Sequence, residues 1–456
     1  MFVEKVKSPG LAHLSYLLGA GTQAAVVDPR RDCDVYIEMA AARGARITHV
    51  FETHRNEDLI SGAPVLAART GATVYHGPNP AEPIAYARTA HEGQAFELGG
   101  MRVEVVETPG HTDDSLSFVV KDTDFGEEPV AVFTGDALFI GDVGRTDFYP
   151  DRPRKVAAAL YNSLQKLIAL GDQTLIYPAH GAGSVCGSGM ADREFSTIGY
   201  ERRNNPRLQI DSKEAFVAAK VGEHHYQPPY FRCMERLNID GAPPMPQAPG
   251  QAPLDPATFE QRASGAAIVD VRSTEAFLGA HLPGSLSIPE PMIPAFAGWL
   301  LDYESDLLLV GDSAGQVRTA AVHLGRIGYD RVVGWLAASM PVWAAGGRRF
   351  NTLAAVDIET VRRRQAEHAK EWCLIDVRGA DEVEKGRIPG STHIYVGEVP
   401  ERLRELDRRR HFTVLCGSGA RATVAASVLL KAGFENVDLF LGSMGAWTTA
   451  GERVER

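Results

Sequence analysis

The stretch FETHRNEDLISG, residues 51–62, decides the fold of the first half of the chain. It places a histidine and acidic residues directly after a short β-like run, RITHVF. The arrangement recurs in the loops TPGHTDDS, FTGDALF and YPAHGAGS, so that the four loops together contribute His54, His111, Asp136 and His180. A single histidine at a strand end is usually structural. Four such loops in this order favour a metal site, because imidazole and carboxylate are common ligands of transition metals.

The bulk composition is that of a globular protein with several domains. The 456 residues predict about three domains of ~150 residues each, and 44% hydrophobic with 23% charged residues is typical of such chains. The net charge of −11 argues against nucleic acid or an anionic membrane as the main partner. No apolar run approaches the roughly 18 residues of a membrane span, and the first residues lack the apolar core of a signal peptide. We therefore expect a cytoplasmic protein without a membrane partner.

The chain divides at a segment rich in proline, glycine and alanine, GAPPMPQAPGQAPLDP, which predicts an extended linker. An internal repeat follows it. AIVDVRSTEAFLGAHLPGSLSIP (267–289) is matched by CLIDVRGADEVEKGRIPGSTHIY (373–395), and SMPVWAAGG (339–347) by SMGAWTTAG (443–451). This spacing is too long for a solenoid repeat and indicates two copies of one small α/β domain. The expected boundaries are 1–240 for the first domain, 241–256 for the linker, and 257–350 and 351–456 for the two copies.

The first domain resembles a known family in the loops that carry the histidines. Their order resembles the metallo-β-lactamase fold, and TPGHTDDSLSF, FTGDALFIGDVGRTDF and IYPAHG resemble the persulfide dioxygenases within it. The resemblance implies an αββα sandwich and one Fe(II) per chain, held by His54, His111 and Asp136. Two imidazoles and one carboxylate leave open positions on iron for a substrate sulfur and O₂.

The opening stretch departs from the motif T-H-x-H-x-D-H that the superfamily usually carries. His54 and Asp58 are kept, but Asn56 and Leu59 stand where two further histidines are expected. By the resemblance, binuclear zinc hydrolases need those histidines and the mononuclear iron site does not use them as ligands. The sequence therefore favours one metal over two, with zinc as the alternative to iron.

Several residues near this site, other than the three expected metal ligands, have expected roles of their own. We expect Asp58 to orient a ligand or a water, because metal-bound imidazoles donate their free N–H to an acceptor. By the resemblance, His180 lies near the metal, where a role beside the metal is favoured over direct ligation. Arg145 either holds a substrate carboxylate or braces its loop. Cys186 either meets the persulfide or is an inert small hydrophobe. Asp28 is open between a buried acid that caps a loop and other roles.

The last copy carries the motif VLCGSGARA, with Cys416 at the end of an apolar strand and Arg421 before a helix-like run. Backbone N–H groups of such a turn, a helix N-terminus and Arg421 would together stabilise a thiolate or persulfide anion. The five cysteines are scattered and odd in number, which also favours reduced, reactive thiols over disulfides. With LIDVRGADEVEKGRIPGS upstream, the domain resembles a rhodanese sulfurtransferase.

The middle copy lacks the nucleophile. LLLVGDSAGQVRTAA aligns with FTVLCGSGARATVAA, so that Gly311 replaces Cys416 and Gln316 replaces Arg421. Without a thiol there is no group to carry sulfur. We expect an inactive rhodanese-like domain that serves packing, spacing or the binding of a small anion.

The whole chain thus resembles a persulfide dioxygenase fused to a rhodanese: an α/β multidomain protein with a metallo-β-lactamase sandwich and two rhodanese-like domains. The expected activity oxidises a low-molecular-weight persulfide with O₂ to sulfite and interconverts sulfite, persulfide and thiosulfate. The alternatives are a zinc-dependent hydrolase of the thioesterase or glyoxalase II kind, and a non-catalytic first domain that supports the sulfurtransferase. Small sulfur compounds are the expected partners, and a homo-oligomer is left open.

Overall fold

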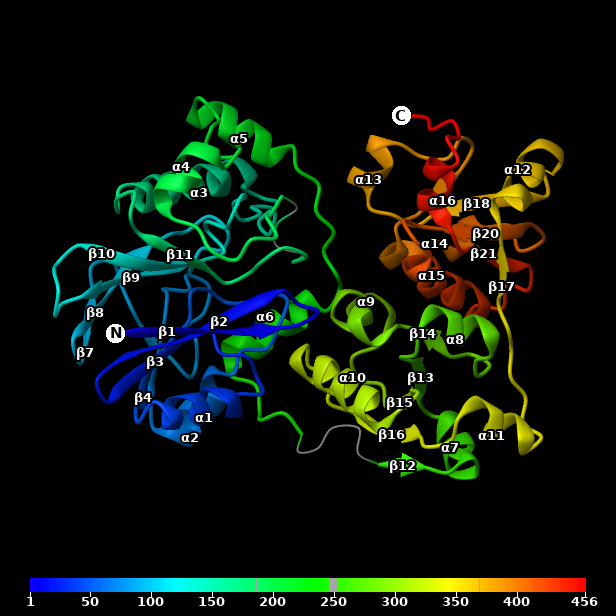
Figure 1. The fold of residues 1–456 in the computed structure, drawn as a ribbon, viewed down its shortest axis with the longest axis horizontal. Helices are drawn as coiled ribbons and strands as arrows, with labels where there is room; N and C mark the ends of the chain where they lie inside the picture. Colours follow the sequence, from blue (N-terminus) through cyan, green and yellow to red (C-terminus); the bar gives the residue numbers. More distant parts are fainter. Residues whose placement is uncertain (185–186, 188, 247–251, 369) are drawn as a thin grey trace. The chain divides into compact units, whose positions relative to one another are not determined.

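The computed structural model describes residues 1–184, 187, 189–246, 252–368 and 370–456. The chain forms two compact units, drawn in Figure 1. The first is Met1–Met245 with Arg326–Gly328, and the second is Pro246–Gly325 with Tyr329–Arg456. Of the expected linker 241–256, residues 247–251 lie outside the described part of the chain, and its last residues already join the next sheet.

The first unit contains two sheets. The first, in the order β1-β2-β3-β4-β5-β6, consists of β1 (Phe2–Ser8), β2 (His13–Ala20), β3 (Gln23–Val27), β4 (Arg46–Phe51), β5 (Thr73–His76) and β6 (Arg88–Thr89). The second, in the order β11-β10-β9-β8-β7, consists of β7 (Ala95–Leu98), β8 (Met101–Glu107), β9 (Leu116–Asp122), β10 (Pro129–Gly135) and β11 (Leu175–Pro178). The helices are α1 (Asp34–Ala42), α2 (Ala63–Thr70), α3 (Pro153–Ile168), α4 (Ile198–Asn204), α5 (Lys213–Val221) and α6 (Phe231–Asp240).

Three layers of apolar side chains hold this unit together. The central layer joins the facing sides of the two sheets, with Phe51 from the first and Phe118 and Phe133 from the second. A second cluster packs α1 and α2 on the outer side of the first sheet, and a third packs α3 and α5 on the outer side of the second. Every residue of β2 is buried, as expected for a strand covered on both faces. The αββα sandwich is confirmed.

The second unit repeats one sheet design. The first copy has the order β12-β16-β15-β13-β14 and the second β17-β21-β20-β18-β19, and all strand pairs in both are parallel. The strands of the first copy are β12 (Pro253–Leu254), β13 (Ala267–Asp270), β14 (Leu286–Ser287), β15 (Leu307–Val310) and β16 (Val332–Leu336). Those of the second are β17 (Ala354–Val356), β18 (Trp372–Asp376), β19 (Thr392–His393), β20 (His411–Leu415) and β21 (Val437–Phe440).

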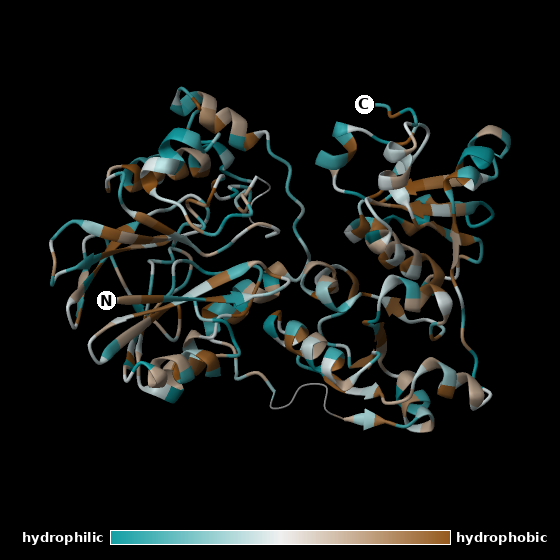
Figure 2. Ribbon diagram, viewed as in Figure 1, coloured by the Kyte–Doolittle hydropathy of each residue, from teal (hydrophilic) through white to brown (hydrophobic). Residues whose placement is uncertain are grey.

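Helices flank both of these sheets. The first copy has α7 (Pro256–Ala263), α8 (Thr274–Gly279), α9 (Ile293–Leu300), α10 (Ala314–Arg326) and α11 (Met340–Ala345). The second has α12 (Ile358–Glu367), α13 (Ala380–Lys385), α14 (Val399–Arg402), α15 (Ala420–Lys431) and α16 (Ser443–Thr449), and short 3₁₀ turns lie at Glu290–Met292, Val396–Glu398 and Leu403–Glu405. Flanking helices alternate between brown and teal in Figure 2, as expected for helices with one buried face. Within the described residues, no helix is long and apolar enough to span a membrane.

Candidate metal centre

The loop that follows β4 fixes the orientation of His54. Asp28, a buried residue at the unusual φ of 49°, accepts hydrogen bonds from the backbone N–H of Thr53 at 2.7 Å and from its hydroxyl at 2.8 Å. The same hydroxyl oxygen lies 2.9 Å from Nδ1 of His54. Because the hydroxyl proton points to Asp28, the oxygen accepts from Nδ1–H, and the lone pair of the ring is on Nε2.

His111, in the loop after β8, is held in the same tautomer by a different group. Its Nδ1 lies 3.1 Å from the backbone carbonyl of Arg145, which can only accept. Nδ1 therefore carries the proton, and Nε2 is a buried acceptor without a hydrogen-bond partner. Burial lowers the pKa of His54 and lowers that of His111 to about 4. Both rings are thus neutral near pH 7, which is the state that a metal ligand requires.

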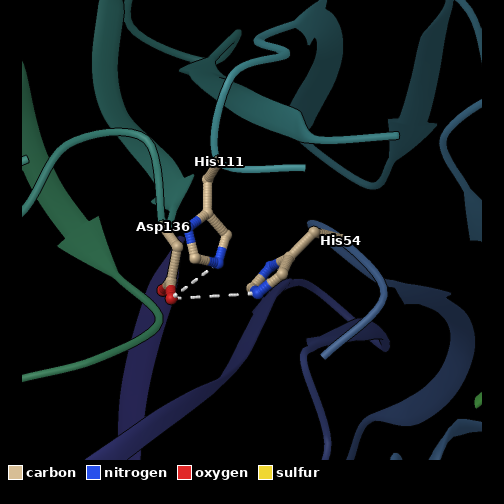
Figure 3. A group of neighbouring side chains, drawn as sticks. All are labelled: His54, His111 and Asp136. Atoms are coloured by element: carbon tan, nitrogen blue, oxygen red, sulfur yellow. Dashed lines mark ion pairs between the residues drawn. The ribbon is translucent and has the colours of Figure 1, made fainter. Parts of the chain in front are cut away.

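Asp136, directly after β10, completes the group. Its Oδ2 lies 3.4 Å from Nε2 of His111 and 3.8 Å from Nε2 of His54, and Figure 3 shows both rings turned toward this oxygen. One ligand atom from each residue lies within 4.8 Å of the others. Burial opposes ionisation, but His180 and the two ligand histidines hold the pKa of Asp136 far below its ordinary value. Two neutral imidazoles and a carboxylate facing one another are a donor set that suits a divalent transition metal.

His180, after β11, lies between two carboxylates. Its Nδ1 is 2.8 Å from Oδ1 of Asp136, and its Nε2 is 3.0 Å from Oδ2 of Asp58. Burial alone would lower the pKa of His180, but these two carboxylates raise it well above the ordinary value. Nδ1 of His180 is hydrogen-bonded to Asp136, whereas the contact of Nε2 with Asp58 is an ion pair without hydrogen-bond geometry. Asp58 and His180 are therefore engaged with each other.

In the second unit, Cys416 directly follows β20 and faces the turn before α15. Its Sγ accepts a hydrogen bond from the backbone N–H of Gly419 at 3.1 Å, and its own N–H donates to Oγ of Ser443 at 3.0 Å. Gly419 has φ +107°, and a Cβ there would lie 2.8 Å from the carbonyl oxygen of Leu441. The turn thus requires glycine at the residue whose N–H reaches the sulfur.

Arg421 binds a partner that the sequence did not reveal. Its Nη1 and Nη2 lie 2.5 and 2.8 Å from the two carboxylate oxygens of Glu382 on α13. The guanidinium is therefore held at the rim of the Cys416 loop by an acid from the segment GADEVEKG. The only advance indication was that segment's place beside the DVR motif that both copies share.

Comparison with known proteins agrees with both halves of the chain. Residues 8–180 match the Metallo-beta-lactamase superfamily, and residues 255–346 and 358–450 each match the Rhodanese-like domain. The hydroxyacylglutathione hydrolase of Acidiphilium cryptum is 31% identical over 233 residues, covering 51% of this chain and 79% of that protein. The chain belongs to the metallo-β-lactamase superfamily. It carries two rhodanese-like domains behind that domain.

Two further relatives are informative. The mitochondrial persulfide dioxygenase ETHE1 of Mus musculus is 29% identical over 261 residues, covering 54% of this chain and 84% of that protein. A crystal structure of a metallo-beta-lactamase from Staphylococcus aureus superposes with a TM-score of 0.67 at 29% identity, covering 74% of this chain and 98% of that one. That share exceeds the metallo-β-lactamase domain alone, so the likeness continues into the rhodanese-like part.

At two positions this chain differs from the superfamily motif, and neither side chain is placed to act as a metal ligand in place of an imidazole. Asn56 is buried and turns its amide nitrogen toward the carbonyl of His54, 3.5 Å away. Leu59 is buried as well and offers no ligand atom. Between them, Glu57 points its carboxylate toward His111, with Oε2 3.9 Å from Nε2. Burial raises the pKa of Glu57 well above its ordinary value. Glu57 was not predicted as a site residue, although it stands inside the stretch FETHRNEDLISG.

Arg145 and Cys186 are the two other residues that the sequence places at the site. The guanidinium of Arg145 is buried and donates to both carboxylate oxygens of Asp147 at 2.6 Å, and also to the carbonyl of Tyr226. These bonds brace the loop whose carbonyl holds His111, which favours bracing over the binding of a substrate carboxylate. Cys186 lies outside the described residues.

A cavity of about 340 Å³ adjoins the site, and its lining includes His13, His180, Lys7 and Arg193.

The loop of the middle copy is filled by its own side chain. Oε1 of Gln316 accepts the backbone N–H of Asp312 at 2.8 Å, and Nε2 donates to the carbonyl of Val271 at 3.2 Å. A Cβ on Gly311 would lie 2.6 Å from Cγ2 of Val317. The backbone N–H of Asp312, which could bind an anion, thus already donates to Gln316. This contact argues against the expected anion-binding role.

Proposed function

We propose that the first domain is a mononuclear non-haem iron persulfide dioxygenase and that the last domain is a sulfurtransferase that uses its product. The first reaction is RSSH + O₂ + H₂O → RSH + SO₃²⁻ + 2 H⁺. In the second, the Cys416 thiolate takes the outer sulfur of another RSSH and releases RSH; sulfite then attacks that outer sulfur, the S–S bond breaks, and thiosulfate and the Cys416 thiolate are formed. The substrate class is a low-molecular-weight thiol persulfide.

One observation carries the choice of a single metal. By the family resemblance, binuclear zinc hydrolases need the motif histidines at positions 56 and 59. Here Leu59 has no ligand atom, and His180 forms close contacts with Asp58 and Asp136 through its two ring nitrogens. His180 thus already contacts both nearby carboxylates, Asp58 and Asp136. His54, His111 and Asp136 remain for one metal.

The residues of this chain prepare the site for that chemistry. The hydroxyl of Thr53 and the carbonyl of Arg145 keep the Nε2 lone pairs of His54 and His111 directed at the metal position, and the contact with His180 orients Asp136. Burial of all three ligands excludes bulk water. Iron(II) would supply the electrons that O₂ needs to react with a closed-shell persulfide, as well as open positions for both reactants.

The sulfurtransferase assignment rests on the environment of Cys416. The N–H of Gly419 and the N-terminus of α15 face its sulfur, and this arrangement stabilises an anion on sulfur through hydrogen bonding and the helix dipole. Sulfite is the natural acceptor, because the first reaction makes it. The middle copy has no thiol and takes no part in the transfer.

A zinc hydrolase is the second candidate, and the 31% identity to a hydroxyacylglutathione hydrolase favours it. That class uses two metals, so its ligand requirement conflicts with Leu59 and with the contacts of His180. If the first domain only supports the sulfurtransferase, we expect neither a bound metal nor O₂ uptake.

The test measures O₂ consumption by iron-loaded protein with a panel of thiol persulfides, together with metal content per chain. We expect about one iron per chain and O₂ uptake with at least one persulfide. His54→Ala, His111→Ala and Asp136→Ala should each lose both, because a site with three ligands tolerates no vacancy. Binding of two zinc ions with thioester hydrolysis would instead establish the hydrolase. Absence of metal and of O₂ uptake would establish the supporting role.

A further inference from the structure

Glu57 is a buried acid beside His111, outside the group of three residues whose ligand atoms all lie within 4.8 Å of one another. It is 2% exposed, and neither of its side-chain oxygens has a hydrogen-bond partner among the described residues. Its Oε2 lies 3.9 Å from Nε2 of His111. The cation nearest to its other oxygen is Arg55, at 3.6 Å from Oε1, which is closer to Glu235 at 3.2 Å. Arg55 thus donates its hydrogen bond to Glu235 and leaves Glu57 without one.

Two of the groups that meet here are acceptors, and the third is an acid whose pKa burial raises well above its ordinary value. Nε2 of His111 carries a lone pair, because Nδ1 donates to a carbonyl. Oδ2 of Asp136 lies 3.4 Å from that nitrogen, and Oε2 of Glu57 approaches it from another direction. Acceptors that face one another in a water-excluded interior repel unless a cation lies between them. An unpaired buried carboxylate costs several kcal/mol, and in proteins such groups are paired or coordinate metals.

We propose that Glu57 supplies a carboxylate oxygen to the metal held by His54, His111 and Asp136. It would replace the imidazole that the superfamily motif has at the position of Asn56, one residue earlier. The inference rests on the proposed metal centre and makes it a site of two imidazoles and two carboxylates. With a divalent metal and neutral imidazoles, the site would be electrically neutral rather than carry one positive charge. The added oxygen ligand would shift the preference of the site toward Fe(II) and Mn(II).

The test uses Co(II) as an anaerobic spectroscopic probe of the full-length protein. The dissociation constant and the visible absorption band are measured for wild type, Glu57→Gln, Glu57→Asp and the control Glu235→Gln, which removes the other carboxylate beside Arg55. We expect Glu57→Gln to weaken Co(II) binding at least about 10- to 100-fold and to change the band, since even residues that only support ligands have effects of that size. Glu57→Asp should lie between it and wild type, and Glu235→Gln should match wild type.

The outcomes separate this inference from the proposed function. If wild type binds one Co(II) and Glu57→Gln binds it with the same affinity and the same band, Glu57 is not a ligand and only this inference fails. If wild type binds no Co(II), the metal centre itself fails. The unfolding temperature of the metal-free proteins is the check on folding. Glu57→Gln should not lower it, because the substitution keeps the size of the side chain and breaks no hydrogen bond among the described residues.

Discussion

At the scale of single residues, the two metal-facing imidazoles donate to acceptors of different kinds, a backbone carbonyl and a side-chain hydroxyl. The carbonyl behind His111 belongs to the backbone and cannot be removed by substitution. The hydroxyl behind His54 belongs to Thr53 and depends in turn on Asp28. Of the two imidazoles, His54 is therefore the one whose orientation a side-chain substitution can disturb without removing a ligand.

Thr53→Val should weaken metal binding by about 10- to 100-fold, because valine has nearly the same shape but cannot accept from Nδ1–H. It should also lower the free energy of unfolding by about 1–3 kcal/mol, since the carboxylate of Asp28 loses one of its two hydrogen bonds. Thr48→Val is the matched control, because the hydroxyl of Thr48 lies 2.9 Å from Nδ1 of His49, which is not a metal-site residue. Metal titration of both variants checks the prediction, and equal affinities would contradict it.

The sequence predicted some of these residues and not others for a physical reason. His54, His111 and Asp136 each follow an apolar strand, and strands of a sandwich end at a common edge, so their convergence could be predicted. The direction in which Glu57 points depends on the backbone within a loop, which has no periodicity to interpret. The partner of Arg421 could not be predicted either, because Glu382 comes from another helix.

At the scale of elements, the turn between β20 and α15 is what distinguishes the active copy. Gly419→Ala should lower thiosulfate:cyanide sulfurtransfer by roughly 100-fold, the effect of losing one preorganised N–H donor. The added Cβ would meet the carbonyl of Leu441, and φ +107° is unfavourable for alanine. Gly417→Ala is the control, since its Cβ would meet only the end of the Arg421 side chain, at 3.3 Å. Steady-state kinetics of both variants decide the matter, and equal losses would show that the turn is merely sensitive to bulk.

The equivalent turn between β15 and α10 should resist conversion into an active site. Gly311→Cys, introduced into Cys416→Ser protein, should restore no sulfurtransfer, because the new Cβ would meet Val317 and Gln316 already occupies the N–H of Asp312. Mass spectrometry after incubation with thiosulfate should find no persulfide at residue 311. Recovery of transfer would show that the missing thiol is the only defect of this copy.

The repeated elements were the most predictable part of the fold. Matching motifs in both copies predicted matching sheets, and the strand orders are the same. Strand β12 was not predicted, because its two residues, Pro253 and Leu254, stand in a segment whose composition is that of a linker. They pair with β16 through the backbone, which composition does not reveal.

At the scale of the whole molecule, two compact units each contain one reactive group. The metal ligands all lie in the first unit, and Cys416 lies in the second. Substitution of Cys416 should therefore leave persulfide-dependent O₂ uptake largely unchanged while abolishing thiosulfate:cyanide sulfurtransfer. Neither activity alone shows whether sulfite made in the first unit is used in the second, so the products must be measured.

Wild-type protein turning over a persulfide with O₂ should release part of its product as thiosulfate, and Cys416→Ser should shift that product to sulfite. The reason is chemical: serine cannot carry the sulfane sulfur that sulfite attacks. Cys373→Ser, which alters a buried thiol on β18, should keep the wild-type ratio. The measurement is the sulfite-to-thiosulfate ratio at matched O₂ consumption. If the ratio is the same in wild type and Cys416→Ser, the two units do not exchange an intermediate, and the fusion joins two independent activities.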